Sequence, residues 1–445
     1  MNSPSSNPKK IALISLGCPK NLVNSEEMAA LLENAGYAFT DDPGQADAVI
    51  VNTCAFIESA KSEAIEKLLE AASYREENPA LKLIAAGCLA QRYSKEIRAE
   101  LPEVDGVIGT GSYSEVVSVV ESVLSGGRPT VCGSISAPLR DLPRVVSTGP
   151  SWAYLRIAEG CDNCCAYCVI PSIRGRYRSR PKESVLKEAE LLSRSGVKEL
   201  IIVAQDITRY GTDLYGKRRL ADLLRELCRM DFSWIRLHYL YPEEIDDDLI
   251  DVIAGEEKIV KYLDIPIQHI NDAILSRMNR RSTGAQIRAL FRKLRERIPG
   301  LVLRTSLITG LPGEGEAEFE ELCSFLREAR IERAGVFPYS PEEGTRAERM
   351  SDRCTSEEAQ RRAGICMDIQ AEIMDDFADS LIGRTLDVLV MGYEGDGAPW
   401  GRSAYDSPDI DSRVIFSGSA LPGEMVRVRI LSADEGELIG ERVEE

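Results

Sequence analysis

The fold and the chemistry of this chain are best interpreted from one stretch, Cys161-Asp162-Asn163-Cys164-Cys165-Ala166-Tyr167-Cys168. It holds thiols in C-x3-C-x2-C spacing at Cys161, Cys165 and Cys168. A cubane iron-sulfur cluster normally takes four protein cysteines, so a compact loop of three leaves one iron open to a small molecule. The spacing therefore predicts a 4Fe-4S cluster with a free coordination position.

Other interpretations of the same thiols stay open. A zinc site would need four N or S ligands, usually in two paired elements, and no second pair lies near the loop. A disulfide framework is less expected in a long chain whose N-terminus lacks the apolar segment of a signal peptide. Cys164 stands in C-x2-C spacing from Cys161, so it could compete for iron.

The loop resembles that of radical S-adenosylmethionine (radical SAM) enzymes, with Tyr167 as the aromatic residue before the last cysteine. The resemblance implies that Cys161, Cys165 and Cys168 hold the cluster and that Cys164 is a spectator. It also implies that SAM chelates the open iron through its amino and carboxylate groups. An electron from the cluster would then release a 5'-deoxyadenosyl radical, while the protein supplies binding and orientation.

Length and composition indicate a globular protein with several domains. The 445 residues predict about three domains, and 44% hydrophobic with 28% charged residues is an ordinary globular composition. No stretch is long and apolar enough for a membrane span, so we expect a cytoplasmic protein whose twelve cysteines are reduced or bound to metal. The net charge of −18 argues against a general nucleic-acid binder and favours a basic partner.

Residues 8–125 alternate apolar runs with helical patterns, which predicts a parallel α/β sheet. Cys18, Cys54 and Cys88 each follow a predicted strand within three residues. Parallel strands end at one edge of a sheet, so we expect these thiols to meet there and bind a second cluster, although a free cysteine is more often structural. The predicted strands are 10–16, 46–51, 81–86 and 104–108, and the predicted helices are 25–35 and 59–72.

Residues 126–150 have the Gly, Pro and Ser content of a linker, and residues 151–376 predict an incomplete (β/α)6 barrel. The cysteine loop follows its first strand, at the edge where parallel barrels place their active loops. The segment 308–313 resembles the region where radical SAM enzymes pack the adenosine of SAM, so Gly310 and Tyr167 are expected SAM contacts. A plain turn and core packing are the structural alternatives. The predicted strands are 153–157, 199–204, 234–240, 262–267, 301–308 and 334–337.

No acid–base pair is assigned, because radical hydrogen abstraction does not need one. His238 and His269 are the only histidines, and neither is given a catalytic role. The remaining cysteines share no spacing and are predicted to be structural; they are Cys132, Cys228, Cys323, Cys354 and Cys366.

Residues 379–445 contain short β-rich runs separated by Gly, Pro and Asp, which predict a small β-barrel. The barrel resembles the TRAM domain, which is often an RNA-binding module. From Leu381 onward the segment carries thirteen acidic and six basic residues, a net charge of −7. A negative barrel repels tRNA and attracts a basic protein, so tRNA is not expected as the substrate. The predicted strands are 385–391, 414–416, 425–431 and 437–443.

The chain resembles the RimO branch of the methylthiotransferases over nearly its whole length. The stretches that carry the resemblance are 15–23, 262–269 and 401–411, and the departures are Cys164 and Ala404-Tyr405. The resemblance implies a SAM-dependent radical transferase that methylthiolates the β-carbon of an aspartate in ribosomal protein S-twelve, a basic small-subunit protein. One SAM would supply the methyl group and a second the radical, while the electron donor and the sulfur source stay unidentified.

The resemblance also divides the work between two 4Fe-4S clusters. The cluster at Cys161, Cys165 and Cys168 would generate the radical, and the cluster at the three strand ends, Cys18, Cys54 and Cys88, would present sulfur. A tRNA (adenosine) methylthiotransferase is the nearest alternative, and a non-catalytic iron-sulfur electron-transfer protein is a more remote one. Release of 5'-deoxyadenosine on adding SAM would separate an enzyme from an electron carrier.

Overall fold

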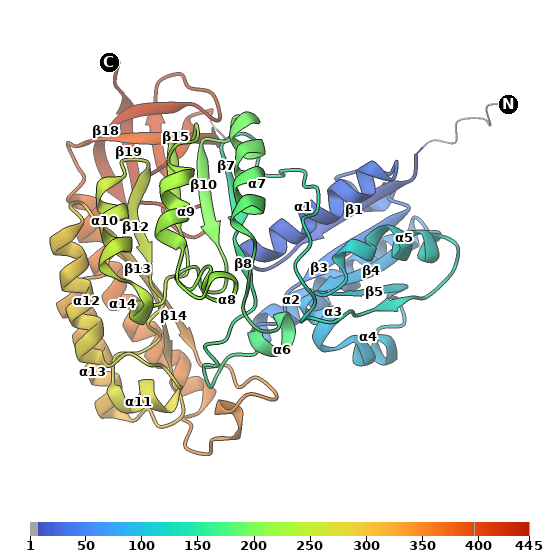
Figure 1. Cartoon of the computed structure of the whole chain (residues 1–445), viewed down its shortest axis with the longest axis horizontal. Coiled ribbons are helices and arrows are strands. Elements are labelled where there is room, and N and C mark those ends of the chain that lie inside the picture. Colours follow the sequence, from blue (N-terminus) through green and yellow to red (C-terminus); the bar gives the residue numbers. More distant parts are fainter. Residues whose placement is uncertain (1–7, 396, 445) are drawn as a thin grey trace. The chain divides into compact units, whose positions relative to one another are not determined.

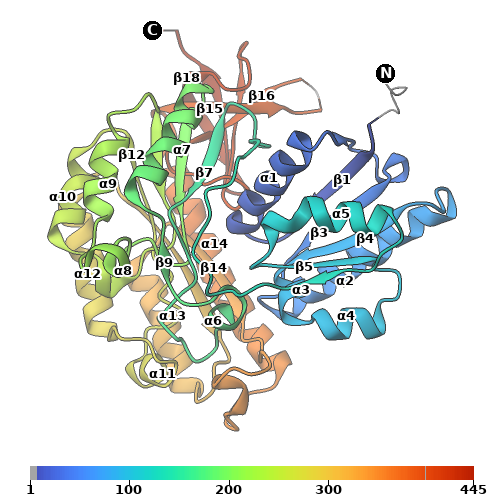
Figure 2. The same ribbon diagram turned by 45° about the vertical axis from the view of Figure 1, so that its right-hand side comes forward.

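The computed structural model describes residues 8–395 and 397–444, so the polar stretch 1–7 and the barrel acids Asp396 and Glu445 lie outside the described residues. The described residues form two compact units. The first holds the residues up to Ser147 together with Glu159–Cys164 and Cys168–Arg178. The second holds Thr148–Ala158, Cys165–Tyr167 and the residues from Ser179 onward. Figures 1 and 2 show the elements of each unit.

The first unit is built on a parallel sheet with the order β2-β1-β3-β4-β5-β6, which confirms the predicted N-terminal fold. Helices α1 and α5 cover one face, and α2, α3 and α4 cover the other (Figure 2). Successive side chains of a strand point to opposite faces. In β3, Ala48 and Ile50 therefore join the first face's core, while Val49 and Val51 join the second.

The elements of this unit alternate between strands and helices, except that β2 precedes β3 without an intervening α-helix and α3 precedes α4 without an intervening strand. Their bounds are β1 Lys10–Ser15, α1 Pro19–Asn34, β2 Ala38–Phe39, β3 Ala48–Thr53, α2 Glu58–Ser73, β4 Lys82–Gly87, α3 Cys88–Arg92, α4 Ser94–Glu100, β5 Gly106–Gly109, α5 Val116–Leu124, β6 Thr130–Val131 and α6 Ile170–Arg174.

The first helix begins earlier than the sequence indicated. We expected it to begin at Ser25, and this was wrong, because α1 begins at Pro19 directly after Cys18. Proline suits the first helical position, where the backbone N–H it lacks would have no partner within the helix. Cys18 is therefore the N-cap of α1, and Asn21 lies in the first turn.

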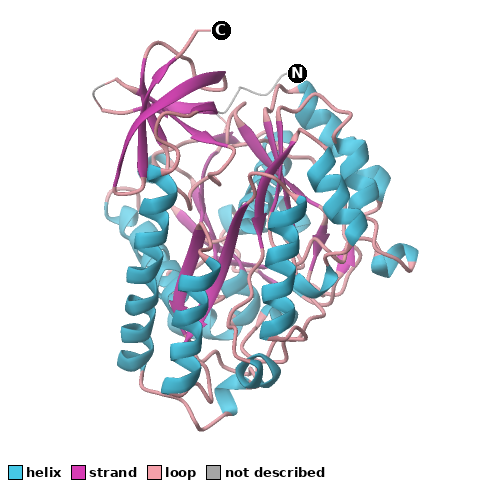
Figure 3. Cartoon of the chain, turned by 90° about the vertical axis from the view of Figure 1, so that its left-hand side faces the viewer, coloured by secondary structure: helices cyan, strands magenta, loops and turns pink. Residues whose placement is uncertain are grey.

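The second unit contains an open parallel sheet with the order β14-β13-β12-β11-β10-β7. Since β7 and β14 are free edges, the sheet is not closed, as an incomplete barrel requires. Helices flank one side of this sheet (Figure 3). The bounds are β7 Trp152–Arg156, α7 Lys182–Arg194, β10 Glu199–Val203, α8 Thr212–Tyr215, α9 Leu220–Leu227, β11 Trp234–Leu237, α10 Asp247–Gly255, β12 Ile259–Asp264, α11 Asp272–Arg277, α12 Gly284–Arg297, β13 Val302–Thr309, α13 Glu316–Ala329, β14 Arg333–Pro338 and α14 Ser356–Asp379. The short strands β8 Ala158–Glu159 and β9 Arg178–Ser179 have residues in both units.

The C-terminal segment of the second unit is a closed five-stranded barrel with the order β15-β16-β17-β19-β18, as predicted. One of its strands, β16, was missed, because a run that starts with proline and contains glycine has little strand character. The strands are β15 Thr385–Tyr393, β16 Pro399–Ser403, β17 Val414–Ser417, β18 Met425–Asp434 and β19 Glu437–Arg442.

The barrel is joined to the central sheet through buried charges. Glu199 at the start of β10 accepts hydrogen bonds from Arg236 Nε at 2.6 Å and from Arg402 Nη2 at 2.5 Å. Asp406 of the barrel accepts from Arg333 of β14 at 2.8 Å, so part of the barrel's acidity is neutralised by the core. The stretch 401–411 is therefore a structural joint within this unit.

Among the residues that the structure describes, no helix combines the length and the apolar character that crossing a bilayer demands.

Replacing Glu199 by Gln should destabilise the second unit. The substitution keeps the side chain's shape but leaves two buried guanidinium groups without their carboxylate, which costs about 3–5 kcal/mol of unfolding free energy. Urea unfolding of the full chain measures the loss. The control is Glu190→Gln, which removes an exposed i,i+4 pair with Arg194 worth less than about 1 kcal/mol. Equal losses for the two variants would contradict the structural importance of the buried pair.

The stabilisation by Glu199 should disappear in acid. Burial raises the pKa of Glu199, but the Arg236 and Arg402 guanidinium groups outweigh burial and hold the pKa below its ordinary value. A carboxylate with a depressed folded-state pKa stabilises the protein above its unfolded pKa of about 4.3. The stability difference between the wild type and Glu199→Gln should therefore be full at neutral pH and shrink as pH falls below that value. A difference that grows in acid would contradict this sign.

Candidate functional site

The structure brings the three strand-end cysteines together in the first unit. Cys18 follows β1, Cys54 directly follows β3, and Cys88 is the first residue of α3 after β4. These three strands are neighbours in the sheet, and Thr53 is in register with Gly87. Their carboxyl ends therefore meet at one edge, which is the edge where open α/β sheets bind ligands.

Two glycines allow the cysteines to approach each other. Gly17, at φ +88°, precedes Cys18, and an added Cβ there would lie 2.8 Å from the Cys54 Cβ and 3.1 Å from its Sγ. Gly87, at φ +95°, precedes Cys88, and an added Cβ there would lie 2.3 Å from the Asn52 Oδ1. Any larger residue at either position would displace groups at this edge of the sheet.

Two polar residues that the sequence analysis missed hold this edge. The Asn21 side chain donates hydrogen bonds to Leu16 O at 2.9 Å and to Thr53 O at 3.0 Å, so it ties together the chain segments that lead into Cys18 and Cys54. The Arg174 guanidinium donates to Asn21 Oδ1, and its Nη2 lies 3.5 Å from Cys88 Sγ. No sequence pattern indicated that Arg174 would lie here, because it belongs to α6 and stands 86 residues after Cys88.

The pKa shifts show that the three thiols affect one another. Burial raises the pKa of Cys18, but the charges of Lys20 and Arg174 and two backbone N–H groups bring it below its ordinary value. Burial, together with repulsion from the other two thiolates, raises the pKa of Cys54 to about 12. Burial also raises the pKa of Cys88 against the opposing effect of Arg174. Three thiolates at one place require positive charge, which iron ions supply when cysteines ligate them.

The donor set therefore suits an iron-sulfur cluster held by Cys18, Cys54 and Cys88. Among the residues that the structure describes, no three Cys, His, Asp or Glu side chains are arranged around a single metal ion. A cubane binds each of its cysteines through a different iron, so it calls for a wider separation of the sulfurs than one ion does.

The cysteines of the loop 161–168 are divided between the two units, with Cys165 in the second and the other three in the first. In the first unit, Cys161 Sγ accepts a hydrogen bond from the Asn163 N–H and Cys168 Sγ accepts one from the Ile170 N–H, both at 3.5 Å. Such donors favour thiolates. Cys164 has φ +52° and is exposed, whereas Cys161 is buried.

Cys165 lies in the second unit beside a buried cation. The Tyr241 hydroxyl is 3.5 Å from Cys165 Sγ, and the Arg280 Nη1 is 3.8 Å from it. The Arg280 guanidinium lies 4.4 Å from the centre of the Tyr241 ring and donates to Pro266 O at 2.7 Å. Arg280 was also missed, since it stands in a loop without a recognisable motif.

The two predicted SAM contacts lie in well-packed surroundings. Tyr167 packs against an apolar cluster that contains Leu311, one residue after Gly310. An added Cβ at Gly310 would lie 2.4 Å from the Ala359 Cβ of α14, and the Gly310 N–H donates to Glu314 Oε1 at 2.9 Å. Close packing against α14 therefore accounts for this glycine, and its contact with SAM stays a prediction.

Both histidines are buried and hydrogen-bonded. His269 Nδ1 accepts from the Asn271 N–H at 3.0 Å, and its Nε2 lies 3.4 Å from Glu314 Oε2. Because Nδ1 accepts, Nε2 is the ring nitrogen that carries a proton, and it faces the Glu314 carboxylate. Glu314 in turn orients the loop at Gly310. His238 Nε2 is 2.9 Å from Ser407 Oγ of the barrel joint.

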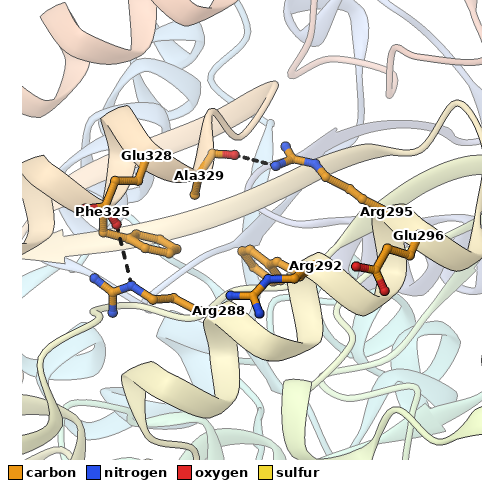
Figure 4. A pocket seen from close by; sticks show the side chains of 8 residues that line it. Arg288, Arg292, Arg295, Glu296, Phe325, Glu328 and Ala329 are labelled. Carbon is orange, nitrogen blue, oxygen red and sulfur yellow. Dashed lines mark hydrogen bonds and ion pairs between the residues drawn. The ribbon is translucent and has the colours of Figure 1, made fainter.

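A surface groove of about 430 Å³ lies between α12 and α13, and it contains none of the predicted site residues. Two of its three arginines are engaged by neighbours: Arg288 lies over the Phe325 ring and pairs with Glu328, and Arg295 donates to Ala329 O (Figure 4).

Known families match successive parts of the chain. Residues 10–109 match the uncharacterized protein family UPF0004, residues 155–326 match the radical SAM superfamily, and residues 382–443 match the TRAM domain.

Similar curated proteins align with almost all of the chain. The ribosomal protein uS12 methylthiotransferase RimO of Lachnoclostridium phytofermentans is 48% identical over 437 residues, covering 97% of this chain and 99% of that protein. The protein of the same name from Caldanaerobacter subterraneus is 47% identical over 438 residues, covering 97% and 100%.

A solved structure shares the fold. The radical S-adenosylmethionine methyltransferase TsrM from Kitasatospora setae superposes with a TM-score of 0.53 at 16% identity, covering 74% of this chain and 72% of that one. At this identity the likeness concerns the fold alone.

Gly17→Ala should reduce the iron that the chain takes up on anaerobic reconstitution, because the added methyl group displaces Cys54. Gly36→Ala is the matched control, since Gly36 has φ +90° but nothing within 4 Å of an added Cβ. Both variants carry the left-handed backbone strain of about 1–2 kcal/mol, but only the first disturbs a thiol. Iron and sulfide assays per chain measure the difference. Equal iron in both variants would contradict a binding role for this edge.

Proposed function

The chain belongs to the family of ribosomal protein uS12 methylthiotransferases RimO, and from this membership we propose that it adds a methylthio group to the β-carbon of an aspartate in ribosomal protein uS12. The observation that carries the proposal is a likeness of 48% identity over 97% of the chain. The chain is a SAM-dependent radical enzyme, since residues 155–326 match the radical SAM superfamily. Membership in that superfamily implies SAM and a 4Fe-4S cluster.

We assign the SAM-binding cluster to Cys161, Cys165 and Cys168, and a second 4Fe-4S cluster to the three strand-end cysteines. When bound, SAM and the clusters supply the radical, the methyl group and the sulfur. The protein's part is to hold and orient the ligand sulfurs. It does so with backbone N–H groups at Cys161 and Cys168 and with the guanidinium beside Cys165.

Tyr167 and Gly310 are the proposed contacts to SAM. Tyr167 and Leu311 share one apolar cluster, which places the aromatic residue of the cysteine loop beside the glycine-containing segment 308–313. The hydrogen bond from Gly310 N–H to Glu314 holds the backbone of that segment in one conformation. The proposed domains are an N-terminal domain at 8–125, a linker at 126–150, a radical SAM core at 151–376 and a TRAM-like barrel at 379–445.

The family relationship, more than barrel charge, favours a protein substrate over tRNA. Pairing with the core leaves the net charge of −7 unchanged, because Arg333 neutralises Asp406 of the barrel while Glu199 neutralises Arg402 of the barrel. A ribosomal protein substrate places the proposed reaction in the cytoplasm. The electron donor and the sulfur donor have no assigned identity.

The test is intact-mass analysis of uS12 and nucleoside analysis of bulk tRNA after anaerobic incubation with the reconstituted full chain, SAM, sulfide and dithionite. The expected result is a methylthio gain on uS12 and none on tRNA. A gain on tRNA alone would mean that the chain is a tRNA methylthiotransferase. Release of no 5'-deoxyadenosine at all would favour a non-catalytic iron-sulfur protein.

Serine substitutions should separate the two thiol sets. Cys165→Ser should abolish 5'-deoxyadenosine release and methylthio transfer together, because it removes a ligand of the SAM-binding cluster. Cys54→Ser should abolish methylthio transfer but retain SAM cleavage. The control is Cys132→Ser, an exposed cysteine outside both sets, which should keep both activities. Retained methylthio transfer in Cys54→Ser would overturn the assignment of the second cluster.

A further inference from the structure

Arg174 is a buried cation that contacts one of the three strand-end cysteines, Cys88. Its side chain is 2% exposed. Besides Asn21 and the Cys88 sulfur at 3.5 Å, the guanidinium donates to Asn24 Oδ1 at 3.1 Å and to Glu159 Oε2 at 3.0 Å. Within the first unit, the guanidinium therefore lies between one carboxylate and one ligand sulfur.

The fold holds this side chain firmly in place. Val169 and Ile173, on either side of the start of α6, belong to the apolar core on the face of α2, α3 and α4. The Thr110 hydroxyl donates to Ile173 O at 2.7 Å, and Arg178 Nη2 donates to Arg174 O at 2.8 Å. Arg174 also follows Cys168 by six residues, so a single short segment carries a ligand of one proposed cluster and reaches a ligand of the other.

We propose that Arg174 is a positioning residue of the second cluster, whose guanidinium donates a hydrogen bond to the Cys88 sulfur and raises the cluster's reduction potential. The inference rests on the proposed function, because it takes Cys88 as a cluster ligand. The proposed function names the residues that bind the cluster, and this inference adds a residue that sets its reduction potential.

The physical reason is charge. Hydrogen bonds to the sulfurs and the local net charge set the potential of an iron-sulfur cluster. One-electron reduction, with the electron supplied by an added reductant such as dithionite, places one more negative charge at the site. A buried guanidinium beside a ligand sulfur stabilises that charge, since the interaction is weakly screened in the interior. Glu159 opposes the effect, because its carboxylate compensates part of the cation's charge.

Glu159 provides a test that a purely structural role of Arg174 would not pass. Arg174→Gln removes the cation and should lower the midpoint potential of the second cluster. Glu159→Gln removes the compensating anion, keeps a side chain of the same shape, and should raise the midpoint potential. Loss of packing alone would give no shifts of opposite sign.

The experiment uses the full chain with Cys161, Cys165 and Cys168 all replaced by Ala, so that only the second cluster can form. After anaerobic reconstitution with iron and sulfide, EPR-monitored titration with dithionite gives the midpoint potential of this parent and of its Arg174→Gln and Glu159→Gln forms. Arg144→Gln is the matched control, because Arg144 is also buried in the first unit but pairs with Glu26 at 2.5 Å. We expect the order Glu159→Gln above parent above Arg174→Gln, with a smaller shift for the control.

Each other result overturns a specific statement. Unchanged or same-sign shifts for the Arg174 and Glu159 variants, or a control shift as large as that of Arg174→Gln, would overturn the role of Arg174. If Arg174→Gln fails to assemble a cluster, the sign of the Glu159→Gln shift decides. A parent that assembles no 4Fe-4S cluster would overturn the second cluster itself, and this outcome is distinguishable because it is seen before any potential is measured.

Discussion

Buried guanidinium groups must be paired, and this constraint runs through both units. An arginine that loses its partner in the interior keeps its charge, because its pKa is too high for deprotonation, and the resulting cost is several kcal/mol. Arg174 forms an ion pair with Glu159 at the cysteine edge, which is the edge of the first sheet where β1, β3 and β4 end. Arg236 and Arg402 share Glu199, which joins the barrel to the central sheet. The pairs of Glu199 connect residues 37 and 203 positions apart in the sequence, so they fix one part of the chain against another.

At the cysteine edge, the parallel order of the strands brings three thiols to the same side of the sheet. Parallel strands β1, β3 and β4 end side by side, and each is followed by a cysteine. Glycines at positions 17 and 87 take up positive φ angles where a side chain would collide with the neighbouring strand end. The same edge then receives Asn21 from α1 and Arg174 from α6, so that the thiols lie in a polar setting although they are largely buried.

Much of the fold could be predicted because hydrophobic periodicity reports secondary structure directly. The strands around Val49 and Ile202 are short apolar runs, and β/α alternation implies parallel sheets. Errors arose where local signals were weak: the start of α1 depended on Pro19 as a first helical residue, and β16 contains proline and glycine. A sequence count of the barrel's charge also does not show that Asp406 is paired with Arg333 and Arg402 with Glu199, two core partners whose charges offset each other.

By itself the sequence determined the two sets of cysteines, the order of the folded parts and the resemblance to a family, because spacing and periodicity are local properties of the chain. The tertiary structure alone decided that Asn21 ties the approaches to Cys18 and Cys54, that Arg174 reaches Cys88, and that Arg280 lies beside Cys165. These partners are separated by up to 115 positions. Only folding brings such residues within hydrogen-bonding distance, since the contact depends on packing and not on any motif.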